Sequence, residues 1–182
     1  MQIDDVVLPV YLIHWNAPEW VASSARSVLG SRGVSICLVV VDNGQEQDSG
    51  LRGLLPSEVE ILPVGLNLGF AGGANLALRH WASRFPECPF AVVGSHDLHV
   101  FPDTLRILVN ATLEHPAYGV IAPFTLDATQ DNAAPPPLEG RELKSPHSEP
   151  EDKEWVPGFC MLLRASCIND IGVFDERFGS YV

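Results

Sequence analysis

Acidic and imidazole side chains follow two apolar segments of the chain, and these residue types could bind a nucleotide and a divalent cation. Asp42 follows the apolar residues 39–41, and Asp97 and His99 follow the apolar segment 90–94. A carboxylate accepts hydrogen bonds from a ring N–H of a base or from a ribose hydroxyl. An aspartate beside a histidine can hold Mg²⁺ or Mn²⁺ next to a diphosphate, and His99 points to the side of Asp97 if the chain stays extended. Taken alone, each aspartate is also explained as a turn residue.

A third polar cluster, His14-Trp15-Asn16, follows the apolar segment 6–13. Trp15 could stack on a base, although a single aromatic residue at a strand end more often belongs partly to the core. Asn16 is predicted to cap a helix that has Pro18 near its first turn. His96, between the polar residues of the other cluster, is predicted to lie on the surface.

Glycines dominate the segment 65–73, which would let the backbone approach a ligand closely before a helix begins. The segment does not follow the first strand and lacks the G-x-G-x-x-G order, which argues against a dinucleotide site of the Rossmann type. A plain flexible connection and a phosphate or sugar contact fit its spacing equally well.

Strand-like and helix-like segments alternate along the first two thirds of the chain. Strands are predicted at 6–13, 35–41, 59–63, 90–94, 120–123 and 155–164, and helices from 16 to 29, from 73 to 83 and from 102 onward. This alternation predicts an α/β domain with a mostly parallel central sheet and helices on both faces. Ligands bind such sheets outside the carboxyl ends of the strands, so the polar clusters should converge on one rim.

The bulk properties are those of one globular domain spanning residues 1–182. The net charge of −12 argues against nucleic acid as the main partner. No apolar run is long enough to span a membrane, the acidic start lacks a secretory signal, and the four cysteines have no C-x-x-C spacing, so a cytoplasmic protein with reduced thiols is predicted. Residues 126–154, rich in proline and acids, are predicted to form a mobile loop.

These segments together resemble glycosyltransferase family 2, in particular its rhamnosyltransferase-like branch. The family's T-Y-N, V-D-N-x-S, N-x-G-F-x-x-G-x-N and N-x-D patterns are matched, in order and in part, by residues 14–16, 41–45, 67–75 and 95–97. Residues 158–164 and 171–178 are close to two further and more specific blocks. The resemblance covers nearly the whole chain.

The resemblance implies the GT-A fold and one inverting displacement at the anomeric carbon of a nucleoside-diphosphate sugar. Mg²⁺ or Mn²⁺ would help the leaving group, and the acceptor would be a carbohydrate, a lipid-linked molecule or a small molecule. The implied metal ligands are Asp97 and His99. The implied nucleotide-sugar contacts are His14, Trp15, Asn16, Asp42, Asn67, Gly69, Phe70, Asn75 and Gly158.

Two positions depart from the family pattern. Ser95 stands at the first D-x-D position, which puts the strength of metal binding in doubt. The family places a Glu-Asp pair, whose aspartate is the expected general base, one residue after the tyrosine that corresponds to Tyr181, whereas this chain stops at Val182. Either the chain is shortened or the protein lacks this base, and Asp175 and Glu176 are weak substitutes. A non-catalytic nucleotide-sugar-binding domain is therefore the main alternative, ahead of a nucleotidyltransferase.

Overall fold

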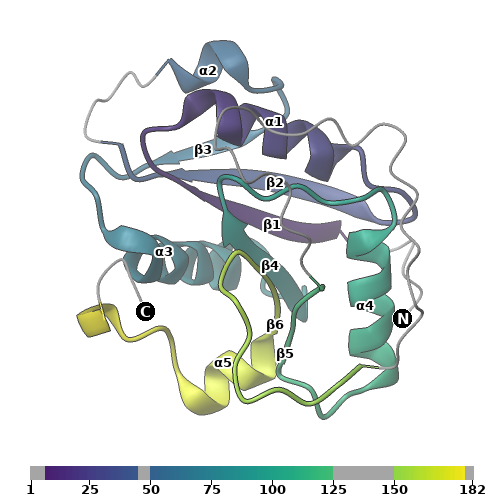
Figure 1. The fold of residues 1–182 in the computed structure, drawn as a ribbon. Helices are drawn as coiled ribbons and strands as arrows, with labels where there is room; N and C mark the ends of the chain where they lie inside the picture. The colour runs from purple at the N-terminus through teal and green to yellow at the C-terminus, as the bar shows by residue number, and fades with distance from the viewer. Residues whose placement is uncertain (1–6, 45–49, 125–149, 179–182) are drawn as a thin grey trace.

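A computed structural model describes residues 7–44, 50–124 and 150–178, which form one six-stranded sheet with helices on both faces (Figure 1). The sheet order is β3-β2-β1-β4-β6-β5; the first four strands along the chain are parallel, whereas β6 is antiparallel to both β4 and β5. The elements in chain order are β1 (Val7–His14), α1 (Pro18–Leu29), β2 (Ser35–Asp42), α2 (Leu51–Leu54), β3 (Glu60–Pro63), α3 (Gly69–Arg84), β4 (Phe90–Ser95), α4 (Thr104–Glu114), β5 (Val120–Ile121), β6 (Cys160–Arg164), α5 (Ala165–Ile171) and the 3-10 helix η2 (Glu176–Phe178). The predicted fold class is confirmed.

The central strand β1 is buried on both faces, which explains why its sequence is a continuous apolar run. Val10 and Leu12 belong to the apolar cluster that α1 and α4 cover, whereas Tyr11 and Ile13 belong to the cluster that α3 covers. Successive side chains of a strand point to opposite faces, so both faces of β1 need apolar residues. The two helical layers therefore hold β1 rigidly and fix the position of its carboxyl end.

Helix α3 packs closely on the sheet because a glycine faces the sheet near its beginning. A Cβ atom added at Gly73 would lie 2.7 Å from Cγ2 of Ile13 and 3.0 Å from Nδ2 of Asn43. Further along the helix, Ala74, Ala77, Leu78 and Trp81 continue the buried face. The close approach brings the first turns of α3 against the ends of β1 and β2.

The direction of the connections reverses at β1, which places a topological switch point at the carboxyl ends of the central strands; we call the region just outside these strand ends the crevice. The chain steps outward from β1 to β2 and β3, then crosses back through α3 to β4 on the other side of β1. Such a switch point is where open α/β sheets bind ligands. The ends of β1, β2 and β4 border this crevice, as the sequence predicts.

Several predicted boundaries differ from the structure. Asn16 does not cap the first helix: Ala17 occupies that position, and Asn16 has a φ of 48°, in the left-handed region that asparagine tolerates. Helix α3 begins at Gly69 rather than 73, and β6 begins only at Cys160. The predicted mobile loop falls mainly outside the described residues, and its last part, 150–154, contains neither helix nor strand.

The cysteines and the membrane prediction can also be compared with the structure. All four cysteines are free thiols; Cys160 is buried and the other three are half-buried. Among the described residues, no helix is both long and apolar enough to cross a membrane.

Candidate functional site

His14 and Asp42 form the buried part of the rim, at the ends of β1 and β2. They are partners in the register of the two strands, and their Nε2 and Oδ1 atoms lie 4.0 Å apart. Only 2% of His14 and 5% of Asp42 are exposed. The backbone N–H of Gly44 donates to Oδ1 of Asp42 at 2.9 Å, so the turn predicted as the plain explanation of Asp42 is present. The same carboxylate nevertheless lies at the rim beside His14.

The environment of His14 keeps its imidazole neutral. Burial lowers the pKa of His14 from 6.5 to about 4; nearby Asp42 works against this shift and His96 adds to it. The Nδ1 atom of His14 is buried and has no hydrogen-bond partner within the described part of the chain. A buried polar atom without a partner is uncommon and costly.

The end of β4 turns back sharply instead of continuing as an extended chain. The N–H of Leu98 donates to the carbonyl of Ser95 at 3.2 Å, and the hydroxyl of Ser95 donates to a carboxylate oxygen of Asp97. The extended chain on which the shared side of Asp97 and His99 was conditional is therefore absent at Asp97, and their joint binding of a metal stays a prediction. Asp97 is exposed, while His99 is half-buried and burial lowers its pKa, partly opposed by Asp97.

Two serines of α1 hold this turn in place. The hydroxyl of Ser24 donates to the carbonyl of His96 at 2.6 Å, and the hydroxyl of Ser27 accepts from the N–H of Val100 at 3.3 Å. The predicted surface position of His96 is also wrong: this side chain is half-buried, and its ring meets that of His14 edge-on at 5.7 Å. The ends of β1 and β4 are thus in direct contact.

The glycine-rich turn joins the end of β3 to the start of α3 and is hydrogen-bonded to the end of β2. Oδ1 of Asn67 accepts from the N–H of Gly69 at 2.8 Å, and Gly69 and Gly65 have φ angles of 69° and 79° that favour glycine. Nδ2 of Asn43 donates to the carbonyl of Gly69 at 3.0 Å, and Oδ1 of Asn43 is buried without a partner among the described residues. Asn43 belongs to the segment that matches V-D-N-x-S, but it was not predicted as a site residue.

A second group of predicted residues lies on the α3 side of the crevice. Phe70 packs against Gly158, where an added Cβ would be 3.3 Å from Cε1 of the ring, and edge-on against Phe174 with the ring centres 6.5 Å apart. Asn75 is 1% exposed, and its amide binds the backbone of Phe174 and the carboxylate of Glu176. A contact of Asn75 with the donor sugar stays a prediction, whereas its part in joining α3 to the later segment is observed.

Both weak candidates for a general base already have partners. Asp175 accepts from the guanidinium of Arg177 at distances of 2.5–3.0 Å, and these hydrogen bonds hold the pKa of Asp175 below its usual range. Glu176 accepts from Nδ2 of Asn75 at 2.8 Å. A paired carboxylate with a lowered pKa is a poorer proton acceptor.

Trp15 and Asn16 lie immediately after β1 and are both exposed, Trp15 by 48%. The structure thus brings His14, Asp42 and the β4 turn together at the crevice. Phe70, Asn75 and Gly158 form a separate cluster, linked to the first through Gly69.

The donor atoms at the end of β4 are of the types that Mg²⁺ and Mn²⁺ accept, an exposed carboxylate and an imidazole. Nε2 of His99 is buried and has no partner in the segments that the structure describes. No group of three or more His, Cys, Asp or Glu side chains in those segments could hold a metal ion by itself. A cation held here would therefore need further oxygen ligands from a bound diphosphate or from water.

Comparison with known proteins finds similarity to enzymes whose names describe sugar transfer. No protein-family model matches the chain. A curated relative, the N-acetylglucosaminyl-diphospho-decaprenol L-rhamnosyltransferase of Mycobacterium tuberculosis, is 20% identical over 97% of this chain and 67% of its own length.

Two solved structures share the fold. TarS 1–349 of S. aureus in complex with UDP has a TM-score of 0.60 at 17% identity, over 96% of this chain and 52% of its own. The mannosyltransferase PcManGT of Pyrobaculum calidifontis, in complex with GDP-Man and Mn²⁺, has a TM-score of 0.60 at 15% identity, over 93% and 47%. The chain thus spans about half the length of these structures. It has the GT-A fold of glycosyltransferases.

Proposed function

We propose that this chain binds a nucleoside-diphosphate sugar at the crevice and that the protein, as a member of glycosyltransferase family 2, transfers the sugar with inversion to an acceptor hydroxyl. One observation carries the proposal: the buried pair of His14 and Asp42 lies beside the turn that presents Asp97, at the switch point of the sheet. The S. aureus and Pyrobaculum structures with this fold contain UDP and GDP-Man, respectively, which supports a nucleotide ligand.

The buried end of the crevice suits the nucleoside. Asp42 can accept a hydrogen bond from a ring N–H or a ribose hydroxyl, and the neutral ring of His14 can donate or accept one. Trp15, exposed at the end of β1, can stack on the base. In a buried setting, a base that leaves these groups unpaired loses affinity, so this end of the site would select the nucleotide.

The exposed end of the crevice suits the diphosphate. The chain has a net charge of −12, so a diphosphate needs a counter-charge that Asp97 can supply only through a cation. Asp97, with His99 beside it, would hold Mg²⁺ or Mn²⁺, which would neutralise the charge that develops on the leaving diphosphate. The Mn²⁺ in the GDP-Man complex of the mannosyltransferase supports this role.

A binding domain without transfer activity is the second candidate function. It is favoured by the hydrogen bonds that occupy Asp175 and Glu176, because attack by a hydroxyl needs a base, worth about 10²–10⁴-fold in rate. In the proposed enzyme the base would come from outside the described residues, as the family resemblance implies. Acceptor-dependent turnover therefore separates the two candidates, whereas donor binding is common to both.

A thermal-shift panel tests the donor site. Ligands that bind only the native state stabilise it by about 2.7 kcal/mol at 100 times Kd, which corresponds to roughly 5–11 °C for a domain of this size. We expect UDP, GDP and dTDP sugars to give different shifts and the largest shift to require Mn²⁺. If no nucleotide shifts the transition by more than about 1 °C with or without Mn²⁺, the donor site does not exist.

A further inference from the structure

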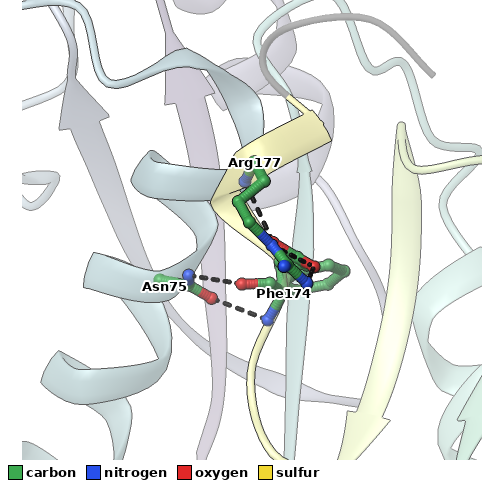
Figure 2. A network of polar contacts seen from close by, with 4 residues as sticks. Asn75, Phe174 and Arg177 are labelled. Atoms are coloured by element: carbon green, nitrogen blue, oxygen red, sulfur yellow. Dashed lines mark hydrogen bonds and ion pairs between the residues drawn. The ribbon is translucent and has the colours of Figure 1, made fainter.

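Asn75 joins α3 to a segment 100 residues later in the chain. Its Nδ2 donates to the carbonyl of Phe174 at 2.9 Å, and its Oδ1 accepts from the N–H of Phe174 at 2.9 Å (Figure 2). The same Nδ2 also donates to Oε1 of Glu176 at 2.8 Å. The side chain is 1% exposed. All three contacts go to one short stretch of chain, so a single buried amide holds this stretch against the helix.

The segment that Asn75 holds is itself a closed turn. The backbone N–H of Arg177 donates to Oδ1 of Asp175 at 3.0 Å, and the guanidinium of Arg177 binds the same carboxylate (Figure 2). This internal pairing makes 174–177 a compact unit that can be moved or fixed as a whole. Its exposed ion pair adds little stability alone, so its position depends on the contacts with α3.

The same segment is in contact with the donor side of the crevice. Phe174 meets the ring of Phe70 in the first turn of α3, and the neighbouring carbonyl of Gly69 accepts from Asn43 at the end of β2. An unbroken series of contacts therefore runs from β2 through the glycine-rich turn to residue 174. The other contacts in this series are a single hydrogen bond or a ring contact, whereas Asn75 contributes three hydrogen bonds.

We propose that Asn75 is a positioning residue that fixes segment 174–177 as one wall of the sugar-transfer site and makes that wall respond to nucleotide binding. The role of the segment as a wall and its response to nucleotide rest on the proposed function, whereas the holding of the segment by Asn75 does not. This holding role explains why an amide is needed: among side chains of this size, only a carboxamide can donate to the carbonyl of Phe174 and to Glu176 while accepting from the N–H of Phe174. A carboxylate keeps the acceptor and loses both donors.

Four variants test the role of Asn75. Asn75→Asp removes both donors and brings a second negative charge to Glu176; Asn75→Asp with Glu176→Gln restores a donor–acceptor pair with the roles exchanged. Glu176→Ala removes one contact at an exposed position and should fold even if the first variant does not. Asn110→Asp, on α4, is the matched control for a new charge in a helix.

Hydrogen exchange of the amides of Phe174 and Arg177 is measured with and without UDP and GDP in the presence of Mn²⁺. We expect Asn75→Asp to exchange these amides at least about 10-fold faster than wild type, Glu176→Ala to be intermediate, the double variant to recover part of the protection, and Asn110→Asp to match wild type. Bound nucleotide, at concentrations that saturate both proteins, should slow exchange at 174–177 in wild type but not in Asn75→Asp.

The outcomes separate the two proposals. Unchanged exchange at Phe174 in both Asn75→Asp and Glu176→Ala, or equal protection by nucleotide in wild type and Asn75→Asp, overturns the positioning role. Loss of protection in Asn75→Asp without recovery in the double variant also overturns it, because a general packing defect would then explain the loss. If neither nucleotide binds wild type, the donor site fails, and the exchange rates without ligand still decide whether Asn75 holds the wall.

Discussion

The two ends of the crevice differ in their exposure to water. At the ends of β1 and β2, His14, Asp42 and Asn43 are between 1% and 5% exposed, and two of their polar atoms have no partner among the described residues. At the end of β4, Asp97 is exposed and His99 is half-buried. Electrostatic interactions are strong and selective in the first setting and are weakened by water and salt in the second.

This difference in exposure suggests that the two ends have different roles in binding. A buried polar group that is left unpaired costs about 1–3 kcal/mol, so the β1–β2 end would discriminate between bases. The β4 end cannot discriminate in this way, but an exposed carboxylate can recruit a cation without first losing its hydration. Selectivity is therefore expected from the buried end and cation-dependent affinity from the exposed end.

The largest expected effect on nucleotide binding concerns the exposed end. Asp97→Ala should remove the Mn²⁺-dependent part of nucleoside-diphosphate affinity, a loss of at least about 100-fold, or about 2.7 kcal/mol. The free energy of unfolding should stay within about 0.5 kcal/mol of wild type because the side chain is exposed. Titration calorimetry with and without Mn²⁺ measures both parts, and Asp103→Ala is the control. If Mn²⁺ still raises affinity in Asp97→Ala, the cation is held elsewhere, with His99 the first residue to change.

The burial of His14 should make the free energy of unfolding depend on pH. The unfolded chain binds a proton at His14 near pH 6.5, whereas the folded protein binds it only near pH 4, so the free energy of unfolding falls as the pH decreases through this window. The full contribution is about 3 kcal/mol. Denaturant unfolding between pH 7 and pH 4 should show this loss in wild type and a correspondingly smaller loss in His14→Gln.

A matched control is His115→Gln, which lies just after α4 and away from the crevice. It should keep the wild-type pH dependence. If the free energy of unfolding changes with pH equally in wild type and His14→Gln, His14 is protonated as readily in the folded protein as in the unfolded chain. Water would then reach the buried end despite its low exposed fraction.

The sequence predicted the strands that position the site better than it predicted the contacts of individual side chains. Apolar runs such as residues 6–13 and 35–41 can only be buried strands, and their order along the chain fixes which carboxyl ends meet. Asp42 and Asp97 could therefore be placed on one rim without a structure. The inward turn of His96 could not, because it depends on a hydrogen bond from Ser24, a residue of another element.

The role of Asn75 was beyond sequence reasoning for a similar reason. The family pattern at 67–75 implied that Asn75 contacts the nucleotide sugar, but its observed partners lie 99 and 101 residues away. Asn43 likewise acts through the carbonyl of Gly69, on which a side-chain pattern gives no information. Contacts from side chain to distant backbone were missed, whereas contacts set by strand order were found.

A smaller effect is expected from a substitution at Gly73, where α3 packs against the ends of β1 and β2. Gly73→Ala places a Cβ within 2.7 Å of Ile13 and 3.0 Å of Asn43, which should lower the free energy of unfolding by about 1–3 kcal/mol and weaken nucleotide binding with it. The control is Gly53→Ala in α2, where an added Cβ has nothing within 4 Å; it should be stabilising by about 0.4–1 kcal/mol. Chemical denaturation measures both. A Gly73→Ala protein as stable as wild type would show that α3 can move away from the sheet at no cost.

The smallest expected effect concerns Trp15, which directly follows His14 at the end of β1 but is itself exposed. Half of its surface is exposed, so it contributes little to the core, and a base stacked on its ring would gain about 0.5–1.5 kcal/mol. Trp15→Ala should therefore weaken nucleotide binding by about 2- to 12-fold, with or without Mn²⁺, and leave the unfolding transition nearly unchanged. Trp155→Ala, which removes a 75% exposed ring, should change neither quantity.

Because stacking acts on the base and not on the phosphates, the loss in Trp15→Ala should be the same for a nucleoside monophosphate and a diphosphate. A loss that appears only with the diphosphate and Mn²⁺ would mean that Trp15 acts on the phosphates or the cation. The assignment of base binding to the β1–β2 end and of cation binding to the β4 end would then be wrong for this residue.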